Sequence, residues 1–370
     1  MKKVLLLSVT AGYGHHSAAA AITDALRERG AECETIDLMR IVGKLPYYVI
    51  DKGYGFTTHR IPHIYGAVFG RMNRRVATPE PSLSSHALRA MMTAPLMREI
   101  ERVQPDAMIS THVFGALAVD ELVRHGRELP KHLGLVTDYD FHPFWEDVPY
   151  SGGIITGSDL MSARAERRGI DTERLLPLGI PVASRFERSL PKEEARRRTG
   201  IPLDAYAVMM ASGSMGFADL TREAVKIAKS GAYTLIVCGR NAKMKAELEA
   251  AKAREGIENM KIYGFVTDGE LLMDAADCIV TKPGGLTTTE AMVKRLPMML
   301  YGPIPGQEDR NAEFLSAVGA GIVCTRDLPP SEAVHYLCSH PAIADRLREA
   351  CARVVTPGAA GRIAEALLSD

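Results

Sequence analysis

Residues 4–30 read VLLLSVTAGYGHHSAAAAITDALRERG, and this stretch predicts how the chain begins to fold. Residues 4–10 form an apolar run of the kind found in parallel strands buried on both faces. Gly12 and Gly14 then permit a tight turn. We expect a helix from about Ser17 to Arg29, with Gly30 as its stop. A strand, a glycine turn and a helix in this order open a Rossmann-like half.

The same order of elements recurs along the chain. In the first half we expect strands near residues 32–37, 106–110, 133–137 and 153–156, and helices near 84–103 and 159–168. The proline- and glycine-containing stretch GIPVASRF (179–186) is typical of a linker. A second series starts at AVMMASGSMG (207–216), with strands near 233–238, 260–263, 277–281 and 297–301 and helices near 219–229, 243–254, 287–294, 308–318, 331–339 and 342–368.

This pattern predicts an α/β protein built from two doubly wound domains, since 370 residues are too many for one ordinary core. We place the domains at residues 1–182 and 183–345, followed by a C-terminal helix (346–370) that packs back on the first domain. Ligands of such sheets bind at the carboxyl ends of the strands, so we expect a cleft between the halves.

The composition is that of a globular protein, with 46% hydrophobic and 24% charged residues. Basic and acidic residues both number 45, so no net charge attracts nucleic acid. The six cysteines form no C-x-x-C pair, and we interpret them as buried thiols of a reducing compartment. The first apolar run is too short for a signal peptide, and no window approaches the roughly 18–20 residues of a membrane-spanning helix. We therefore expect a cytoplasmic protein.

The first glycine turn allows two interpretations. With Asp37 as a ribose-binding acid it is similar to a dinucleotide fingerprint, but Ser17 occupies the place of the third glycine. Alternatively, His15 projects from the turn as a general base, since an imidazole titrates near neutral pH. The neighbouring His16 is expected to cap the helix or pack on the sheet, although the doublet leaves open which ring is the base.

Two loops of the second half contain residues suited to a nucleotide and a sugar. TKPGGLTTTEAM (281–292) joins a strand end to a helix, and Glu290 there either favours the helix start electrostatically or accepts both hydroxyls of a ribose. PIPGQEDRN (303–311) combines a rigid loop with clustered polar side chains, as hydroxyl-rich sugars require. The turn at residues 211–216 offers a further anion-binding helix start.

These motifs resemble the monogalactosyldiacylglycerol-synthase and processive diacylglycerol-glucosyltransferase family, relatives of the peptidoglycan N-acetylglucosaminyltransferase. The resemblance covers most of the chain and rests on these stretches: LLLSVTAGYGHHSAAAAI (5–22), LVTDYDFHPFW (135–145), TGSDL (156–160), LGIPV (178–182), VCGRN (237–241), YGFV (263–266), TKPGGLTTTEAM (281–292) and PIPGQEDRN (303–311). It implies the GT-B fold, with two Rossmann-like domains facing across a cleft.

The resemblance also implies roles for individual residues. His15 is the base that approaches the acceptor hydroxyl, and Asp138 is an acid that faces the cleft, with His142 as a weaker candidate. Glu290 binds the ribose, Phe265 and Val266 present the backbone that reads uracil, and Gln307 and Glu308 contact the donor sugar and diphosphate. The remaining donor-side positions are Gly14, Ser214, Gly216, Arg240, Asn241, Gly284, Gly285, Leu286 and Thr287.

Asp138-Tyr139-Asp140 spells D-x-D, a Mn²⁺-binding pattern of the other large glycosyltransferase fold. It lies in the first half, far in sequence from the nucleotide-binding loops, so a metal there would not bridge the diphosphate. We therefore expect no metal and no cofactor besides the UDP-sugar substrate. Helix N-termini near Gly216 and Thr287 would stabilise the departing UDP instead.

Residues 38–75 contain seven basic residues against one acidic residue, interleaved with aromatic rings. Aromatic rings favour the level of lipid headgroups, and each basic residue near an anionic leaflet contributes about 1 kcal/mol. Together with the resemblance, this composition predicts an anionic-membrane docking surface beside the lipid acceptor. The alternative is a solvated loop with some core aromatics.

We expect an inverting transferase that moves a hexose from a UDP-sugar to diacylglycerol or another lipid at the inner membrane face. Glucose, galactose and N-acetylglucosamine donors are not distinguished by the sequence. Alternatives are N-acetylglucosaminyl transfer to a lipid-linked cell-wall precursor, UDP-sugar 2-epimerisation, and a UDP-sugar sensor without transfer.

Overall fold

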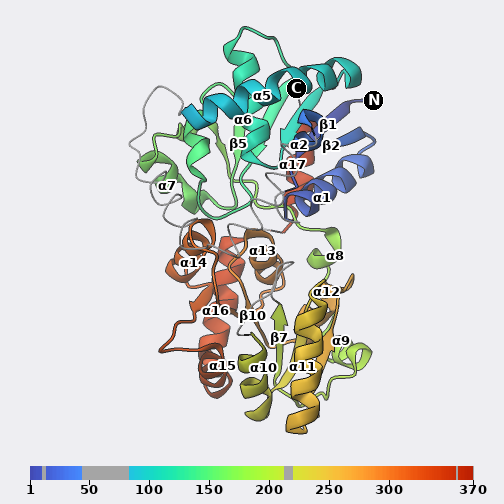
Figure 1. Ribbon diagram of the computed structural model, residues 1–370, viewed down its shortest axis with the longest axis vertical. Helices are drawn as coiled ribbons and strands as arrows, with labels where there is room; N and C mark the ends of the chain where they lie inside the picture. Colours follow the sequence, from blue (N-terminus) through green and yellow to red (C-terminus); the bar gives the residue numbers. More distant parts are fainter. Residues whose placement is uncertain (11–13, 44–82, 212–219, 356, 370) are drawn as a thin grey trace. The chain divides into compact units, whose positions relative to one another are not determined.

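The computed structural model describes residues 1–10, 14–43, 83–211, 220–355 and 357–369, and they form two compact units (Figure 1). Unit 1 comprises residues 1–183, 304–310 and 358–370, and unit 2 comprises residues 184–303 and 311–357. Each unit contains one six-stranded parallel sheet, so the predicted succession of two α/β halves is confirmed.

The sheet of unit 1 has the strand order β2-β1-β3-β4-β5-β6. Its strands are β1 (Lys3–Ser8), β2 (Glu32–Asp37), β3 (Ala107–Ser110), β4 (Lys131–Leu135), β5 (Gly153–Ile155) and β6 (Leu175–Leu176). The longer helices are α1 (Gly14–Glu28), α5 (Leu83–Val103), α6 (Val113–Arg124) and α17 (Ala359–Leu368). The shorter ones are α2 (Leu38–Val42), η1 (Pro143–Asp147), η2 (Asp159–Met161), α7 (Ser162–Arg167) and η3 (Thr172–Arg174). The order reverses beside β1, and such a reversal places ligands at the carboxyl ends of the central strands.

The sheet of unit 2 has the order β12-β11-β10-β7-β8-β9. Its strands are β7 (Ala207–Ala211), β8 (Tyr233–Val237), β9 (Met260–Tyr263), β10 (Cys278–Thr281), β11 (Met298–Leu300) and β12 (Gly321–Val323). Its helices are α8 (Ser184–Glu187), α9 (Lys192–Thr199), α10 (Leu220–Lys229), α11 (Ala242–Glu255), α12 (Gly269–Ala275), α13 (Gly285–Val293), α15 (Pro330–Ser339) and α16 (Pro341–Val354). Helix α14 (Gln307–Ala317) begins among the residues of unit 1 and ends among those of unit 2.

The structure corrects the expected helix at residues 342–368, which is two helices. Helix α16 ends at Val354, and α17 starts at Ala359 after Pro357 and Gly358. Proline cannot continue a helix, and Gly358 has a φ of 89°, which favours glycine. The break lets α17 pack on α1 in unit 1 (Figure 1). The buried Ile363 and Leu367 of α17 join the apolar core there.

Several elements were missed by the sequence pattern, above all the helix α6. Its sequence VFGALAVDELVR is buried along most of its length, including Asp120 and Glu121, so it shows little of the alternation between apolar and polar faces that marks a surface helix. The other missed elements are short: α2, η1, η3, β6, α8, α9, α12 and β12.

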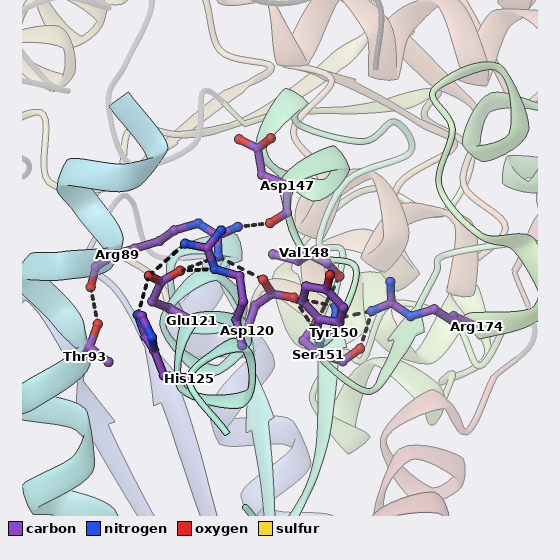
Figure 2. Close-up of polar contacts among 11 residues, drawn as sticks. Arg89, Thr93, Asp120, Glu121, His125, Asp147, Val148, Tyr150, Ser151 and Arg174 are labelled. Carbon is purple, nitrogen blue, oxygen red and sulfur yellow. Dashed lines mark hydrogen bonds and ion pairs between the residues drawn. The ribbon is translucent and has the colours of Figure 1, made fainter. Parts of the chain in front are cut away.

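A buried ion cluster fastens α5 to α6 in unit 1 (Figure 2). The guanidinium of Arg89 is fully buried, and its Nη1 lies 2.8 Å from Asp120 Oδ2 and 3.1 Å from Glu121 Oε2. The other carboxylate oxygen of Asp120 accepts hydrogen bonds from the backbone N–H groups of Tyr150 and Ser151, at 2.6 and 2.9 Å. The cluster therefore ties two helices to the loop that precedes β5.

Two predictions concern the surface of the chain. No helix among the described residues is both long and apolar enough to cross a bilayer. All six cysteines are unpaired, but Cys338 is exposed and Cys33 is only partly buried, so the expectation of six buried thiols is wrong for these two. Cys338 lies in the last turn of α15, on its solvent side.

Candidate active site

His15 lies on the first turn of α1 rather than in the turn that precedes the helix. The helix begins at Gly14, three residues earlier than predicted. His15 Nδ1 lies 2.7 Å from the backbone carbonyl oxygen of Thr111, at the end of β3, and 3.3 Å from Thr137 Oγ1. A carbonyl oxygen only accepts hydrogen bonds, so Nδ1 carries the proton and Nε2 keeps its lone pair.

The surroundings of His15 keep its ring neutral. Burial lowers its pKa to about 4, and the Thr111 carbonyl opposes this shift only in part. At neutral pH the ring therefore offers an unprotonated Nε2, which a general base requires. No described residue forms a hydrogen bond with this nitrogen.

The neighbouring His16 has a structural environment. Its Nδ1 lies 3.0 Å from Ser8 Oγ and its Nε2 lies 2.9 Å from Thr10 Oγ1, so both ring nitrogens are engaged at the end of β1. The Asp37 carboxylate lies 3.7 Å from Nε2 and also accepts from the backbone N–H of Thr10, at 3.1 Å. These contacts support His15, not His16, as the candidate base, and they give Asp37 a role without a dinucleotide.

A pocket of about 260 Å³ lies at the carboxyl ends of β3 and β4. It is lined by His15, Thr111, His112, Val113, Phe114, Leu135, Val136, Thr137, Asp138, Asp140, His142, Trp145 and Gln307. The predicted residues His15, Asp138 and His142 are therefore gathered around one cavity within unit 1. Its walls are partly aromatic, which suits a molecule with apolar and hydroxyl-bearing parts.

Two further histidines of this pocket begin helices. His112 Nδ1 accepts a hydrogen bond from the backbone N–H of Phe114, at 3.1 Å, and thereby caps α6. His142 Nδ1 accepts in the same way from Phe144, at 3.2 Å, and caps η1. Burial lowers the pKa of His142 to about 4 and that of His112 well below its ordinary value. Both rings are therefore neutral at pH 7.

The second acid of the D-x-D pattern is compensated by arginine side chains. The fully buried Asp140 Oδ2 lies 3.2 Å from Arg310, 3.6 Å from Arg164 and 3.6 Å from Arg168. Three guanidinium groups around one carboxylate oxygen leave little reason for a divalent cation to bind there. The described residues contain no cluster of metal-ligating side chains.

In unit 2, Glu290 lies in the second turn of α13, so it is not a first-turn capping residue. Burial raises the pKa of its carboxyl to about 7, Arg185 opposes the shift, and Glu270 adds to it. No described residue forms a hydrogen bond with this carboxylate. A partly buried carboxylate that accepts no hydrogen bond from a described residue is suited to accept the hydroxyls of a bound ribose.

The start of α13 presents backbone donors beside Glu290. Gly284 and Gly285 begin the helix, no side chain caps it, and its first turn contains no acid. The Thr288 hydroxyl donates back to the Gly284 carbonyl at 2.8 Å, and the Thr289 hydroxyl donates to Gly285 at 2.6 Å. The free N–H groups at Leu286 and Thr287 can therefore meet an anion such as a phosphate.

Arg240 and Phe265 follow two neighbouring strands of unit 2, β8 and β9. The Arg240 guanidinium lies over the Phe265 ring, 5.6 Å from its centroid, and the ring is 66% exposed. Asn241 caps α11 by accepting from the N–H of Met244 at 3.0 Å. The exposed ring and the adjacent backbone of Val266 form a surface on which a flat base can rest.

Gln307 and Glu308 lie at the start of α14. Gln307 Nε2 donates to the backbone carbonyl of Asp140 at 2.8 Å and so borders the pocket of His15. Glu308 Oε2 accepts from the N–H of Ile304 at 2.6 Å, closing the loop in which Gly306 has a φ of 110°. These contacts hold the loop in shape, and the predicted contacts with the donor sugar stay predictions.

Three predicted features lie wholly or mostly outside the described residues. They are the first glycine turn at residues 11–13, the positions Ser214 and Gly216 between β7 and α10, and most of the basic and aromatic segment 38–75 between α2 and α5. Conversely, the structure adds Thr111, His112 and Thr137 to the site, which sequence reasoning missed. The only signal for His112 was its place directly after a buried strand and before an apolar helix.

Each half of the chain matches a known protein-family model. Residues 15–182 match the family model for monogalactosyldiacylglycerol (MGDG) synthase, and residues 207–334 match the glycosyltransferase family 28 C-terminal domain. The chain is 24% identical to a processive diacylglycerol beta-glucosyltransferase of Bacillus cytotoxicus, over 100% of this chain and 94% of that protein.

Solved structures share the architecture. MurG of Acinetobacter baumannii superposes with a TM-score of 0.60 at 15% identity, covering 99% of each chain. HepE of Anabaena, solved with UDP and glucose, gives a TM-score of 0.56 at 15% identity, covering 100% of each chain. The GT-B fold that the sequence resemblance implied is confirmed.

Proposed function

We propose that this chain, which belongs to the monogalactosyldiacylglycerol synthase family of GT-B glycosyltransferases, moves a hexose from a UDP-sugar to the free hydroxyl of diacylglycerol. The observation that carries the proposal is the fixed tautomer of His15. Its Nδ1 is engaged with Thr111, and its unprotonated Nε2 belongs to a ring that lines the pocket. This arrangement occurs in the half of the chain that matches the MGDG synthase model.

The reaction is a direct displacement. The acceptor hydroxyl oxygen forms a bond to the anomeric carbon, and the bond from that carbon to the diphosphate oxygen breaks, with its electron pair leaving on UDP. His15 Nε2 takes the hydroxyl proton. A single displacement inverts the α linkage of the donor to β, and a correctly placed base contributes roughly 10²–10⁴-fold to the rate.

On the donor side, Glu290 is the proposed ribose acid. Its carboxylate is partly buried and has no described hydrogen-bond partner, so hydroxyls would satisfy it. The uncapped start of α13 would bind a phosphate, and its helix dipole would favour the negative charge that develops on departing UDP. Uracil would rest against Phe265 and the backbone of Val266.

The proposed location is the inner face of the cell membrane, with residues 38–75 as the docking surface. The support is compositional, namely the excess of basic residues and the interleaved aromatic rings. Vesicle flotation tests it: the protein should float with anionic vesicles and not with zwitterionic ones. If charge reversal at Arg71, Arg74 and Arg75 left flotation unchanged, this segment would not be the docking surface.

The decisive experiment incubates the protein with UDP-glucose, UDP-galactose or UDP-N-acetylglucosamine and diacylglycerol vesicles, followed by mass spectrometry of the lipids. We expect a β-hexosyl diacylglycerol from at least one donor, and its loss in His15→Ala but not in the matched variant Arg98→Met. Arg98 is an exposed residue of α5. Donor conversion without lipid would indicate an epimerase, and UDP-sugar binding without turnover would indicate a sensor.

A further inference from the structure

Two imidazoles of unit 1 meet edge to face in the pocket and carry their protons on opposite nitrogens. The ring centroids of His15 and His112 are 4.6 Å apart, with an interplanar angle of 76°. His15 holds its proton on Nδ1, because that nitrogen faces the Thr111 carbonyl oxygen. His112 must keep Nδ1 unprotonated, because that nitrogen accepts from the N–H of Phe114. Its single proton is therefore on Nε2.

The pocket thus offers a hydrogen-bond acceptor and a hydrogen-bond donor side by side. His15 Nε2 is the acceptor, and His112 Nε2–H is the donor. The backbone N–H of Phe114 occupies the Nδ1 edge of His112, and both rings line the cavity. No described residue forms a hydrogen bond with His112 Nε2.

Each of the two rings keeps its tautomer, because the backbone partner of its Nδ1 atom favours one proton position. Thr111 follows β3 and Phe114 is the second residue of α6, so the Nδ1 atom of each ring faces a backbone partner at the junction of these two elements. Burial lowers the pKa of His112, and the nearby His15 and His142 lower it further. His112 therefore stays a neutral donor even when His15 takes up a proton.

We propose that His112 is a positioning residue that donates its Nε2 hydrogen to a second oxygen of the acceptor, on the carbon next to the reacting hydroxyl. Diacylglycerol has such an oxygen in the ester at its neighbouring glycerol carbon. A molecule with two adjacent oxygens can satisfy the base and the donor together, which directs its hydroxyl proton toward His15. This inference rests on the proposed function and deepens it.

The chain offers a matched pair of variants at this position. In His112→Asn the amide oxygen can still cap α6, because asparagine is among the best capping residues, but the side chain is too short to supply the Nε2 donor. In His112→Gln the longer amide carries N–H groups to the former Nε2 position, while the cap is weakened. The two variants therefore separate the loss of the Nε2 hydrogen-bond donor from the loss of the α6 cap.

The experiment measures kcat and KM of the full chain with two acceptors presented in the same vesicles. One is diacylglycerol, and the other is a long-chain primary alkanol, which has a hydroxyl but no oxygen on the neighbouring carbon. For His112→Asn we expect kcat/KM for diacylglycerol to fall about tenfold, the worth of one well-placed hydrogen bond. The value for the alkanol should fall by much less than tenfold, and His112→Gln should recover most of the activity on diacylglycerol.

The inference is overturned if His112→Asn lowers kcat/KM equally for both acceptors or for neither. It is also overturned if His112→Gln lowers kcat/KM for diacylglycerol as much as His112→Asn does. A thermal unfolding scan of each variant shows whether a common loss comes from the cap. Failure of the proposed function itself has a different signature, since the unmodified protein would then form no glycolipid with either acceptor.

Discussion

Replacing Arg89 with methionine should lower the free energy of unfolding by about 3 kcal/mol at pH 7. The substitution removes a fully buried guanidinium while keeping an unbranched apolar stem of similar length. It leaves the carboxylates of Asp120 and Glu121 without their shared cation in the interior of unit 1. Breaking a buried ion pair from one side typically costs about 3–5 kcal/mol.

The structure places this loss at the lower end of that range. Asp120 keeps two backbone N–H donors, from Tyr150 and Ser151, and Glu121 keeps Arg124 at 3.4 Å and His125 at 3.1 Å. Burial would raise the pKa of Glu121, but Arg124, Arg89 and His125 together lower it below its ordinary value. A depressed carboxyl pKa stabilises the fold above the pKa of the unfolded chain, and this stabilisation disappears as pH falls through the folded value.

Urea unfolding followed by circular dichroism measures the effect. With a slope of roughly 2–3 kcal/mol per molar urea, the transition of unit 1 should shift by about 1 M. The difference between Arg89→Met and the unmodified protein should narrow as the pH falls below about 4.5. Arg98→Met is the matched control, because Arg98 is an exposed arginine of the same helix, and it should stay within about 0.5 kcal/mol. A loss below 1 kcal/mol for Arg89→Met, or strict additivity with Asp120→Asn, would refute the reasoning.

Three further predictions follow from the two candidate sites. Because burial lowers the pKa of His15 to about 4, kcat/KM should decrease only as the pH falls below about 5. A decrease of kcat/KM that is centred near pH 6.5 would contradict the assignment of His15 as the base. Because burial raises the pKa of Glu290 to about 7, the unliganded protein should lose stability as the pH rises from about 4.5 to 7. Glu290→Gln should remove this pH-dependent loss in thermal unfolding scans. The same variant should bind UDP roughly tenfold more weakly in calorimetry. Because the Asp140 carboxylate is surrounded by arginines, treatment with EDTA should leave the transfer rate unchanged, and a rate that needed added Mn²⁺ would show that a cation binds the D-x-D pattern after all.

The helix α6 and the break before α17 were not predicted from the hydrophobic pattern of the sequence. A helix that is buried along most of its length lacks the polar face by which hydrophobic periodicity identifies a surface helix. In the sequence alone, Asp120 and Glu121 suggest a solvent-facing side, and only the structure shows that both pair with the buried Arg89. Likewise, Pro357 and Gly358 were visible in the sequence, but the need for α17 to reach α1 arises only from the packing of unit 1.

Residue order alone predicted the two α/β halves, showed the resemblance to a glycosyltransferase family, and singled out His15 and Glu290 as candidates. These features depend on local residue order, because strands, glycine turns and helix starts follow from neighbours along the chain. The contacts of the two rings come only from the tertiary structure, and they support His15 over His16 as the candidate base. The partners that fix this choice, the Thr111 carbonyl for His15 and the Ser8 and Thr10 hydroxyls for His16, are brought into place by the pairing of β1 with β3 and by the packing of α1 on the sheet.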